Sequence, residues 1–154
     1  MKVFIDTNII LEFLMRRERV DVVETLLESL KQKGETMYMT VGSFYSLLYI
    51  IDNYLRKELE LKKPERIAAT RAIAAQVLED FVVAGQDNDS LLQGVKDLSF
   101  TDLEDSCQYQ AAKRNGCECL ITFNVKDYAG LVRDDSMKIL LPQEYLLNYY
   151  HLEG

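Results

Sequence analysis

Carboxylate and amide side chains stand directly after two short apolar runs of the chain. Asp6 follows residues 2–5, and Asn124 and Asp127 follow residues 118–122. Short runs of β-forming apolar residues are typical of buried strands. The carboxyl ends of parallel strands meet at one edge of a sheet, which is where ligands bind. We therefore expect these three side chains to converge if the two strands are parallel.

Three further acids, Asp102, Glu104 and Asp105, occur at the start of a predicted helix that ends near Asn115. Two interpretations remain open for them. Acids in a first turn stabilise the helix dipole, and Thr101-x-x-Glu104 has the form of a capping box. The same acids would also lie at the sheet edge beside the acid of the first strand, where they could bind a cation.

The spacing along this helix separates its residues into faces. Leu103, Cys107 and Ala111 are four residues apart, which predicts that they form the packed stripe. Asp102 and Asp105 share a different face.

Acidic residues are concentrated in one part of the chain. Residues 85–110 contain six acidic residues and one basic residue, Lys96. Crowded carboxylates repel one another, and a divalent cation offsets that repulsion. Carboxylate oxygens favour Mg²⁺ or Mn²⁺, which activate water and stabilise the leaving oxygen in phosphodiester hydrolysis. The pattern therefore favours a metal-dependent hydrolase of phosphodiesters.

Strands and helices alternate along the chain, which predicts an α/β fold with a mostly parallel sheet of about five strands and helices on both faces. The predicted strands cover residues 2–5, 36–41, 80–84, 118–122 and 137–141, the first at the centre of the sheet. For residues 80–84 a helix is an open alternative. The predicted helices cover residues 9–15, 21–33, 42–55, 64–79, 89–95, 101–115 and 143–150. Their expected caps include Thr7 or Asn8, Asp21 and Asp89.

The overall composition is that of one ordinary domain. The chain has 154 residues, of which 48% are hydrophobic and 28% charged, and its net charge is −7. No apolar run is long enough for a membrane span, and the N-terminus does not resemble a signal peptide, so a cytoplasmic location is expected. The acidity argues against tight, sequence-general binding of nucleic acid.

Soft metal ligands are few. Cys107, Cys117 and Cys119 are expected to be reduced thiols, the last two as small buried residues at the start of a strand. The single histidine, His151, is expected on the surface. A structural zinc site is therefore not expected.

Taken together, five segments of the chain resemble PIN-domain nucleases, in particular toxins of the VapC type. They are residues 3–11, 39–50, 102–109, 119–128 and 139–146, which span nearly the whole chain. The resemblance implies an α/β/α sandwich, a single PIN domain over residues 1–154 and metal-dependent endoribonuclease activity.

The resemblance also implies roles for single residues. Asp6 matches the first metal-binding acid, and Asp105 matches the acid at the start of the late helix. Asn124 stands where many relatives have another acid, and Asp127 is the nearby carboxylate. These four residues are the expected catalytic set, and they are expected to hold one Mg²⁺ or Mn²⁺ ion with further acids from Asp102 and Glu104.

One position departs from the family pattern. Relatives usually carry a glutamate in the helix after the second strand. Its position falls near Ser46 in this chain, where no glutamate is present. Neither Glu12 nor Asp52 is placed to substitute for it. A serine hydroxyl has no charge, although it could hold a water molecule bound to the metal.

A toxin of this type would cleave RNA, bind an antitoxin protein and form a homodimer. The antitoxin would cover the acidic cleft and apolar grooves near the early helices, with an arginine directed at the acids. Phe13, Leu14, Tyr45 and Tyr49 are candidates for that surface, although burial in the core is the expectation for most of them.

Basic residues that could contact RNA occur in two places. Arg16, Arg17 and Arg19 form one group, and residues 56–71 contain the other. A solvated helical face is the default interpretation of the second group.

Two other functions remain as alternatives. The missing glutamate leaves open a catalytically impaired PIN domain that binds RNA or a protein. A phosphatase or phospho-acceptor domain ranks lower. A haloacid-dehalogenase-type phosphatase needs a second Asp two residues after Asp6, where this chain has Asn8, and the acidic pair near the first strand of a receiver domain is absent.

Overall fold

A computed structural model describes residues 1–128 and 137–149; His151 lies outside them. Its sheet has five strands, all paired in parallel, in the order β3-β2-β1-β4-β5. The strands are β1 (Lys2–Ile5), β2 (Thr36–Thr40), β3 (Phe81–Ala84), β4 (Cys119–Ile121) and β5 (Lys138–Leu140). The predicted parallel sheet is confirmed, and β1 occupies its centre as expected.

Strand β1 shows why the sheet is buried on both faces. Val3 and Ile5 pack into one hydrophobic cluster and Phe4 into another on the opposite face, and none of the three side chains is exposed. Successive strand residues point to opposite faces, so a continuous apolar run requires cover on both sides. The same alternation holds in β4, where Leu120 faces the second cluster.

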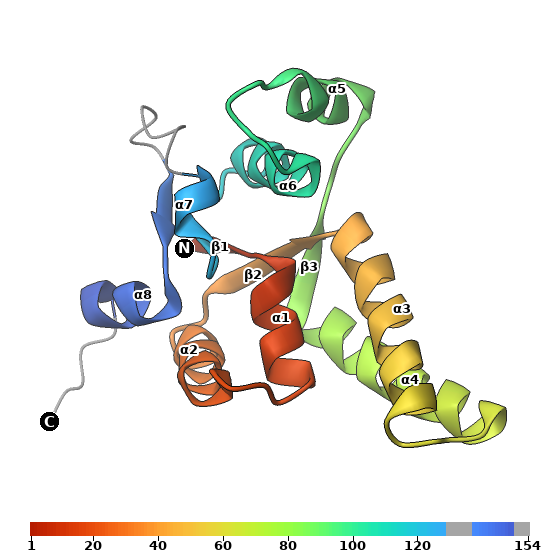
Figure 1. The fold of residues 1–154 in the computed structure, drawn as a ribbon. Coiled ribbons are helices and arrows are strands. Elements are labelled where there is room, and N and C mark those ends of the chain that lie inside the picture. The colour runs from red at the N-terminus through yellow and green to blue at the C-terminus, as the bar shows by residue number, and fades with distance from the viewer. Residues whose placement is uncertain (129–136, 150–154) are drawn as a thin grey trace, which may run out of the picture.

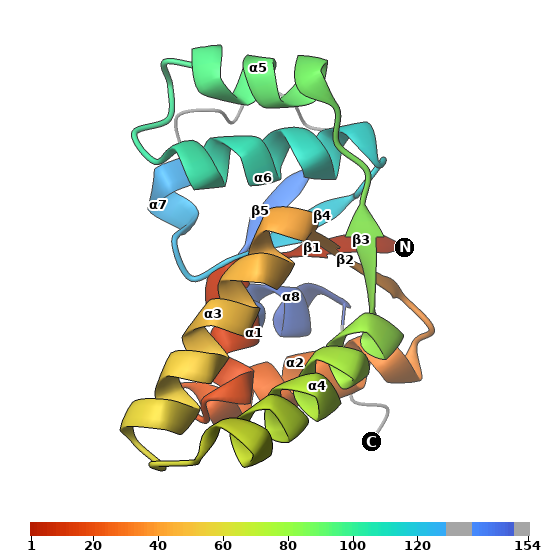
Figure 2. The same cartoon turned by 90° about the vertical axis from the view of Figure 1, so that its right-hand side faces the viewer.

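Helices supply that cover as two layers. Figure 2 shows α5 and α6 on one side of the sheet and α1, α2, α4 and α8 on the other, which confirms the α/β/α sandwich. The helices are α1 (Thr7–Leu14), α2 (Val20–Gln32), α3 (Val41–Lys57), α4 (Lys63–Asp80), α5 (Asn88–Lys96), α6 (Leu103–Arg114), α7 (Val125–Tyr128) and α8 (Pro142–Tyr149). Helices α3 and α4 pack against each other and extend away from the sheet (Figure 1). None of the helices in the described ranges is long and apolar enough to cross a membrane.

Several helices begin at a residue other than the predicted cap. Asp6, not Thr7 or Asn8, caps α1 and accepts a hydrogen bond from the Asn8 amide at 3.3 Å. Helix α2 begins after Arg19 and has no side-chain cap, and α5 is capped by Asp87 instead of Asp89. Asp6 is the one residue between β1 and α1, so it takes the capping position there.

The start of α6 corrects two predictions. Asp102 is the cap, and its carboxylate accepts the Asp105 amide at 3.1 Å, so Thr101 and Glu104 form no capping box. Leu103 is exposed, and the buried face of the helix includes Asp105 and other polar residues. The predicted apolar stripe fails at Leu103 because polar contacts inside the protein turn the polar face inward.

The remaining differences are local. The short helix α7 was not predicted, because four residues are too few for a helical pattern. Cys117 and Cys119 are buried free thiols, as expected. Tyr45 and Tyr49 are 65% and 71% exposed, so the expectation of burial was wrong for both.

Helices α5 and α6 approach closely at Gly94. A β-carbon at this glycine would lie 3.2 Å from the Cα atom of Cys107 and 2.9 Å from its sulfur. The Gly94 carbonyl also accepts the Ser106 hydroxyl at 2.6 Å. This contact anchors α6, and with it the acids at its start, beneath α5.

We predict that Gly94→Val destabilises the protein by about 1–3 kcal/mol, the usual cost of overpacking a tight contact. Gly85→Val is the matched control, because no atom lies within 4 Å of the corresponding position at Gly85. Urea denaturation of the two variants measures the difference. Equal midpoints in the two variants would contradict the close packing of α5 on α6.

Candidate active site

The carboxylate of Asp6 lies at the carboxyl end of the central strand and is almost fully buried. Its Oδ2 atom accepts the Thr122 hydroxyl at 2.8 Å and the Tyr128 hydroxyl at 3.3 Å. Its Oδ1 atom faces the start of α1, whose amides favour a negative charge. Adjacent parallel strands therefore bring Asp6 and the residues after β4 together, as predicted.

Gln108 connects Asp6 to the acid at the start of α6. Its side-chain Nε2 donates to Asp6 Oδ1 at 3.2 Å and to Asp105 Oδ1 at 3.4 Å. Its Oε1 accepts the Thr7 amide at 3.3 Å and lies 3.4 Å from the Ser43 hydroxyl. One amide group thus bridges the two carboxylates from β1 and α6 and is itself held from α1 and α3.

Asp105 is 6% exposed, and its Oδ2 atom has no hydrogen-bond partner among the residues that the structure describes. Burial raises the pKa of this carboxyl to about 7, and the negative charges of Asp6, Asp102 and Asp127 contribute to the rise. The nearby Tyr128 hydroxyl opposes it in part. A buried carboxylate oxygen without a partner, beside another carboxylate, is an environment that a cation would stabilise.

The other predicted site residues lie around this pair. Asp102 and Asp127 are exposed and close enough to act on the Asp105 charge. Glu104 is also exposed, and its Oε1 atom lies 3.2 Å from the Thr7 hydroxyl. Asn124 is connected to the site through its backbone: its amide donates to Thr122 Oγ1 at 3.0 Å, and its carbonyl accepts the Asp127 amide at 2.9 Å.

Ser46, near which the family's usual glutamate falls, lines a hollow of about 280 Å³ that also contacts Glu104 and Gln108. Its lining includes Ser43 and Ser46 from α3 and Glu104 and Gln108 from α6. Glu104 on α6 therefore shares this hollow with Ser46 on α3. Within the described ranges, the side chains that line this hollow include no carboxylate from α3.

Glu12 and Asp52, which were not expected to replace that glutamate, have other partners. Glu12 is buried and accepts the backbone amide of Arg19 at 2.6 Å. Asp52 pairs with Arg66 at 2.8 Å.

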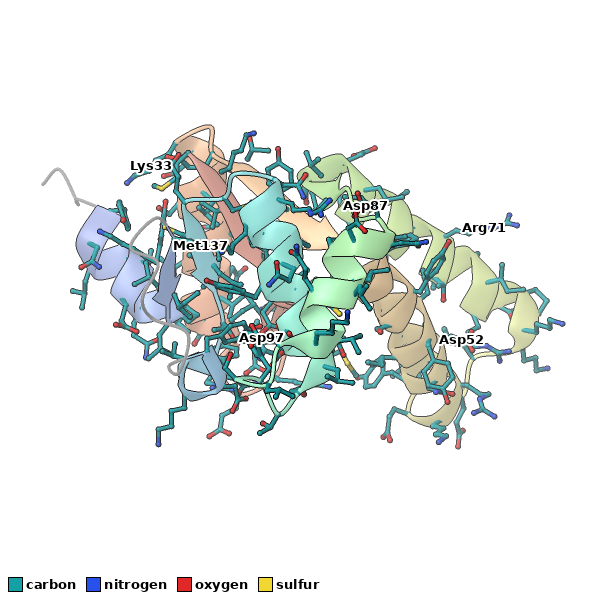
Figure 3. All side chains as sticks on the ribbon, turned by 90° about the horizontal axis from the view of Figure 1, so that it is seen from above. Lys33, Asp52, Arg71, Asp87, Asp97 and Met137 are labelled. Carbon is teal, nitrogen blue, oxygen red and sulfur yellow. The ribbon has the colours of Figure 1, made fainter. Side chains whose placement is uncertain are left out.

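Not all acids of residues 85–110 belong to the site. Asp87 and Asp97 are the caps at the two ends of α5, and Figure 3 shows them well apart along this helix. Asp87 pairs with Arg114 at 2.7 Å, and Asp97 bonds Ser99. The concentration of charge in the sequence therefore overstates the charge around Asp6 and Asp105.

Sequence reasoning missed two central residues, Gln108 and Tyr128. Gln108 follows Asp105 by three residues, and that spacing on a helix could have identified it as a neighbour of the acid. Tyr128 is fully buried, and burial together with both acids raises its pKa, so its hydroxyl stays a neutral donor. Its sequence position carried no such signal, because it lies on the unpredicted helix α7.

The donor set suits a hard cation, although it is not a complete ligand shell. Within residues 1–128 and 137–149, no three His, Cys, Asp or Glu side chains are grouped as a preformed metal site. Two buried carboxylates converge, one with an unpaired oxygen, and exposed acids border them. Oxygen ligands of this kind favour Mg²⁺ or Mn²⁺, which keep several waters.

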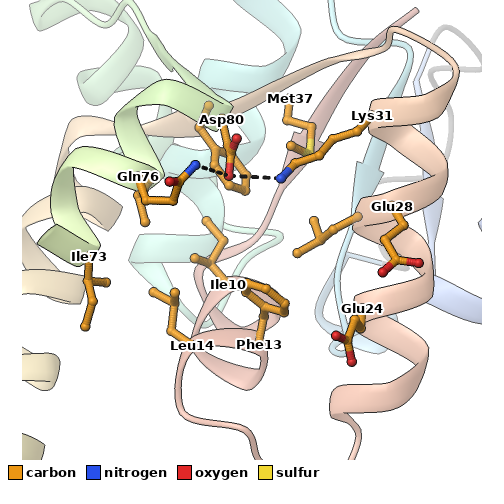
Figure 4. A pocket seen from close by; sticks show the side chains of 13 residues that line it. Ile10, Phe13, Leu14, Glu24, Glu28, Lys31, Met37, Ile73, Gln76 and Asp80 are labelled. Carbon is orange, nitrogen blue, oxygen red and sulfur yellow. Dashed lines mark hydrogen bonds and ion pairs between the residues drawn. The ribbon is translucent and has the colours of Figure 1, made fainter.

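A second concavity lies on the opposite layer, among α1, α2 and α4. It is a largely apolar groove of about 300 Å³, and its lining includes Ile10, Phe13, Leu14 and Ile73 (Figure 4). Acidic side chains at its margin are Glu24, Glu28 and Asp80, of which Asp80 pairs with Lys31 at 3.1 Å.

The raised pKa of Asp105 predicts how stability changes with pH when no metal is bound. Because the folded pKa of about 7 exceeds the unfolded value near 3.8, the contribution of Asp105 is favourable at low pH and is lost as pH rises from about 4 to 7. The loss is of order a few kcal/mol. We expect Asp105→Asn to flatten this dependence in thermal melts with EDTA.

Asp21→Asn, an exposed acid in the first turn of α2, is the control and should keep the wild-type dependence. Added Mg²⁺ at pH 8 should stabilise the wild type more than Asp105→Asn. An identical pH profile for the wild type and Asp105→Asn would contradict the raised pKa.

Comparison with known proteins agrees with the fold. The structure is similar to that of FitAB bound to an IR36 DNA fragment, with a TM-score of 0.62 over 99% of this chain and 98% of that chain. The sequence identity is 14%, so the likeness concerns the fold alone. No curated protein matches the chain. The PIN domain model matches residues 2–126, which include Asp6, Asp105 and the turn after β4. The chain therefore belongs to the PIN domain family.

Proposed function

We propose that this protein is a Mg²⁺- or Mn²⁺-dependent endoribonuclease and the toxin of a toxin–antitoxin pair. The observation that carries the proposal is the pair of buried carboxylates, Asp6 and Asp105, joined by Gln108 and left with one unpaired oxygen. Membership of the PIN family and the resemblance of the motifs to VapC-type toxins support the choice of substrate and role.

In this proposal Asp6 and Asp105 hold the cation. Asp127, Asn124 and Asp102 border it and orient water or complete its shell. A bound divalent cation would activate water and stabilise the leaving oxygen of a phosphodiester. The neutral Tyr128 hydroxyl and the Thr122 hydroxyl hold the Asp6 carboxylate in place by donating to its Oδ2 atom.

Glu104 takes the role of the missing acid near Ser46. It lines the same hollow as Ser46, and its carboxylate lies 3.2 Å from the Thr7 hydroxyl next to Asp6 in the chain. A carboxylate supplied from α6 in place of α3 would restore the charge that the family pattern lacks at this position.

We expect Asp6→Asn to reduce metal-dependent cleavage of a single-stranded RNA by about a thousandfold, because several kcal/mol of charge stabilisation are lost. The fold should remain, since the amide is nearly the same size. Gel assays with Mn²⁺ measure cleavage, and Asp21→Asn is the control. Full activity in Asp6→Asn would exclude the site.

A second function is favoured by one specific observation, the absence of an α3 carboxylate among the described residues that line the hollow. The protein would then be a catalytically impaired PIN domain that binds RNA or a protein. Calorimetry with Mn²⁺ separates the two functions. A nuclease should bind Mn²⁺ with Asp105→Asn binding more weakly, whereas no heat at millimolar Mn²⁺ would support the binding module.

The groove among α1, α2 and α4 suits the antitoxin. Its apolar lining would take the apolar face of a helix, and Glu24, Glu28 and Asp80 would meet basic residues beside that face. Phe13 and Leu14, two of the candidates for the antitoxin surface, lie in this lining.

We predict that Ile73→Lys separates toxicity from neutralisation. Expression of the wild type should arrest growth, and the neighbouring gene product should restore it. Ile73→Lys adds a positive charge to a half-buried groove position, so it should stay toxic and escape rescue. Leu78→Lys on the exposed side of α4 is the control, and rescue of both variants would place the antitoxin elsewhere.

A further inference from the structure

The loop between α1 and α2 carries a net positive charge, from three arginines and one glutamate. It contains Arg16, Arg17 and Arg19, in a protein whose net charge is −7. Arg16 adopts the left-handed backbone conformation, with φ of 46°, and so turns the chain sharply after α1. Arg16 and Arg17 make weak contacts. Arg16 lies 3.7 Å from the Glu24 carboxylate, and Arg17 contacts the Met15 sulfur.

Arg19 differs from these two because its guanidinium is held in one orientation. Its central carbon lies 3.5 Å from the centre of the Phe123 ring, and its Nε atom lies 3.6 Å from Glu12 Oε1. The same Glu12 oxygen accepts the Arg19 backbone amide at 2.6 Å. The buried Glu12, which takes no part in the acid pair, therefore acts as the anchor of Arg19.

The Phe123 ring places Arg19 against the turn that follows β4. Phe123 follows Thr122, whose hydroxyl donates to Asp6 and accepts the Asn124 amide. The turn that carries the Phe123 ring is thus tied to the Asp6 carboxylate through Thr122, and Asn124 is bonded to the same Thr122 hydroxyl. Within the described ranges, the contacts of Arg19 are with Glu12 and Phe123, and its link to Asp6 runs through the turn that Thr122 and Phe123 form.

The guanidinium has donors left over for a ligand. The Arg19 side chain is 56% exposed, and in the described part of the chain Glu12 is its one ionic partner, through the Nε side. A planar guanidinium that is stacked on a ring loses little further entropy on binding, and its paired donors match two oxygens of a phosphate. Arg66 on α4, by contrast, already pairs with Asp52 at 2.8 Å.

From these contacts we infer that Arg19 binds a backbone phosphate of a single-stranded nucleic acid, next to the phosphate that lies at the acids. This inference rests on the proposed nuclease function and deepens it. Arg19 is then a residue that positions the substrate, and Glu12 and Phe123 keep its guanidinium in place. Arg16 and Arg17 add diffuse positive charge around it and draw the strand across an otherwise acidic surface.

Binding of a fluorescent RNA oligonucleotide tests the inference, with the inactive Asp6→Asn protein as background and a series of salt concentrations. Arg19→Gln should weaken binding about tenfold and reduce the salt slope by about 0.7, the value for one phosphate contact on a single strand. Arg19→Lys keeps the charge and the stem, so it should restore the salt slope but only part of the affinity. A role in packing alone would leave the salt slope unchanged.

Arg71→Gln is the matched control (Figure 3 labels Arg71), because it removes one exposed positive charge from α4, which lies on the side of the sheet opposite α6 and whose basic residues are interpreted as a solvated face. In the active protein, Arg19→Gln should raise KM for RNA with little change in kcat. If RNA is bound and cleaved and Arg19→Gln behaves like Arg71→Gln, this inference alone is overturned. If the unmodified protein neither binds nor cleaves RNA, the proposed function fails and Arg19 loses its ligand.

Discussion

The side-chain amide of Gln108 donates to two carboxylates that would otherwise repel each other inside the protein. Asp6 comes from the end of β1 in the sheet and Asp105 from α6 in the helical layer over it. Burial alone makes a second negative charge there costly. The amide satisfies one oxygen of each acid but cannot neutralise either. A small divalent cation could, and the unpaired Oδ2 atom of Asp105 leaves room for such an interaction. The site therefore holds two carboxylates whose negative charge no described side chain neutralises.

Other parts of the fold position the three residues of this contact, Asp6, Asp105 and Gln108. The central position of β1 places Asp6 in the middle of the sheet edge, and parallel pairing with β4 brings Thr122 against it. Helix α5 lies close on α6 at Gly94, which determines where the start of α6 lies. Hydroxyls from α1 and α3 surround the Gln108 oxygen and orient the amide so that its donors face the acids.

Charge is divided over the surface in a way that the net value of −7 conceals. Acids at the two ends of α5 serve that helix, and those beside the apolar groove lie on the opposite layer from the site. The loop after α1 carries three arginines, of which Arg19 is oriented by Glu12 and Phe123. The net charge therefore does not describe the local charge at either place, and overall acidity does not by itself exclude a nucleic-acid substrate.

The sequence by itself determined the parallel sheet, the central place of β1 and the convergence of Asp6 with Asp105, because apolar runs and strand ends are local signals. It also carried the motifs of the PIN family. Only the tertiary structure decided that Gln108 and Tyr128 hold the acids, that Leu103 faces solvent, and that Glu104 shares a hollow with Ser46. These features depend on contacts between residues far apart in the chain. The free energy of such a contact depends on which partners burial brings together, and no single segment specifies them.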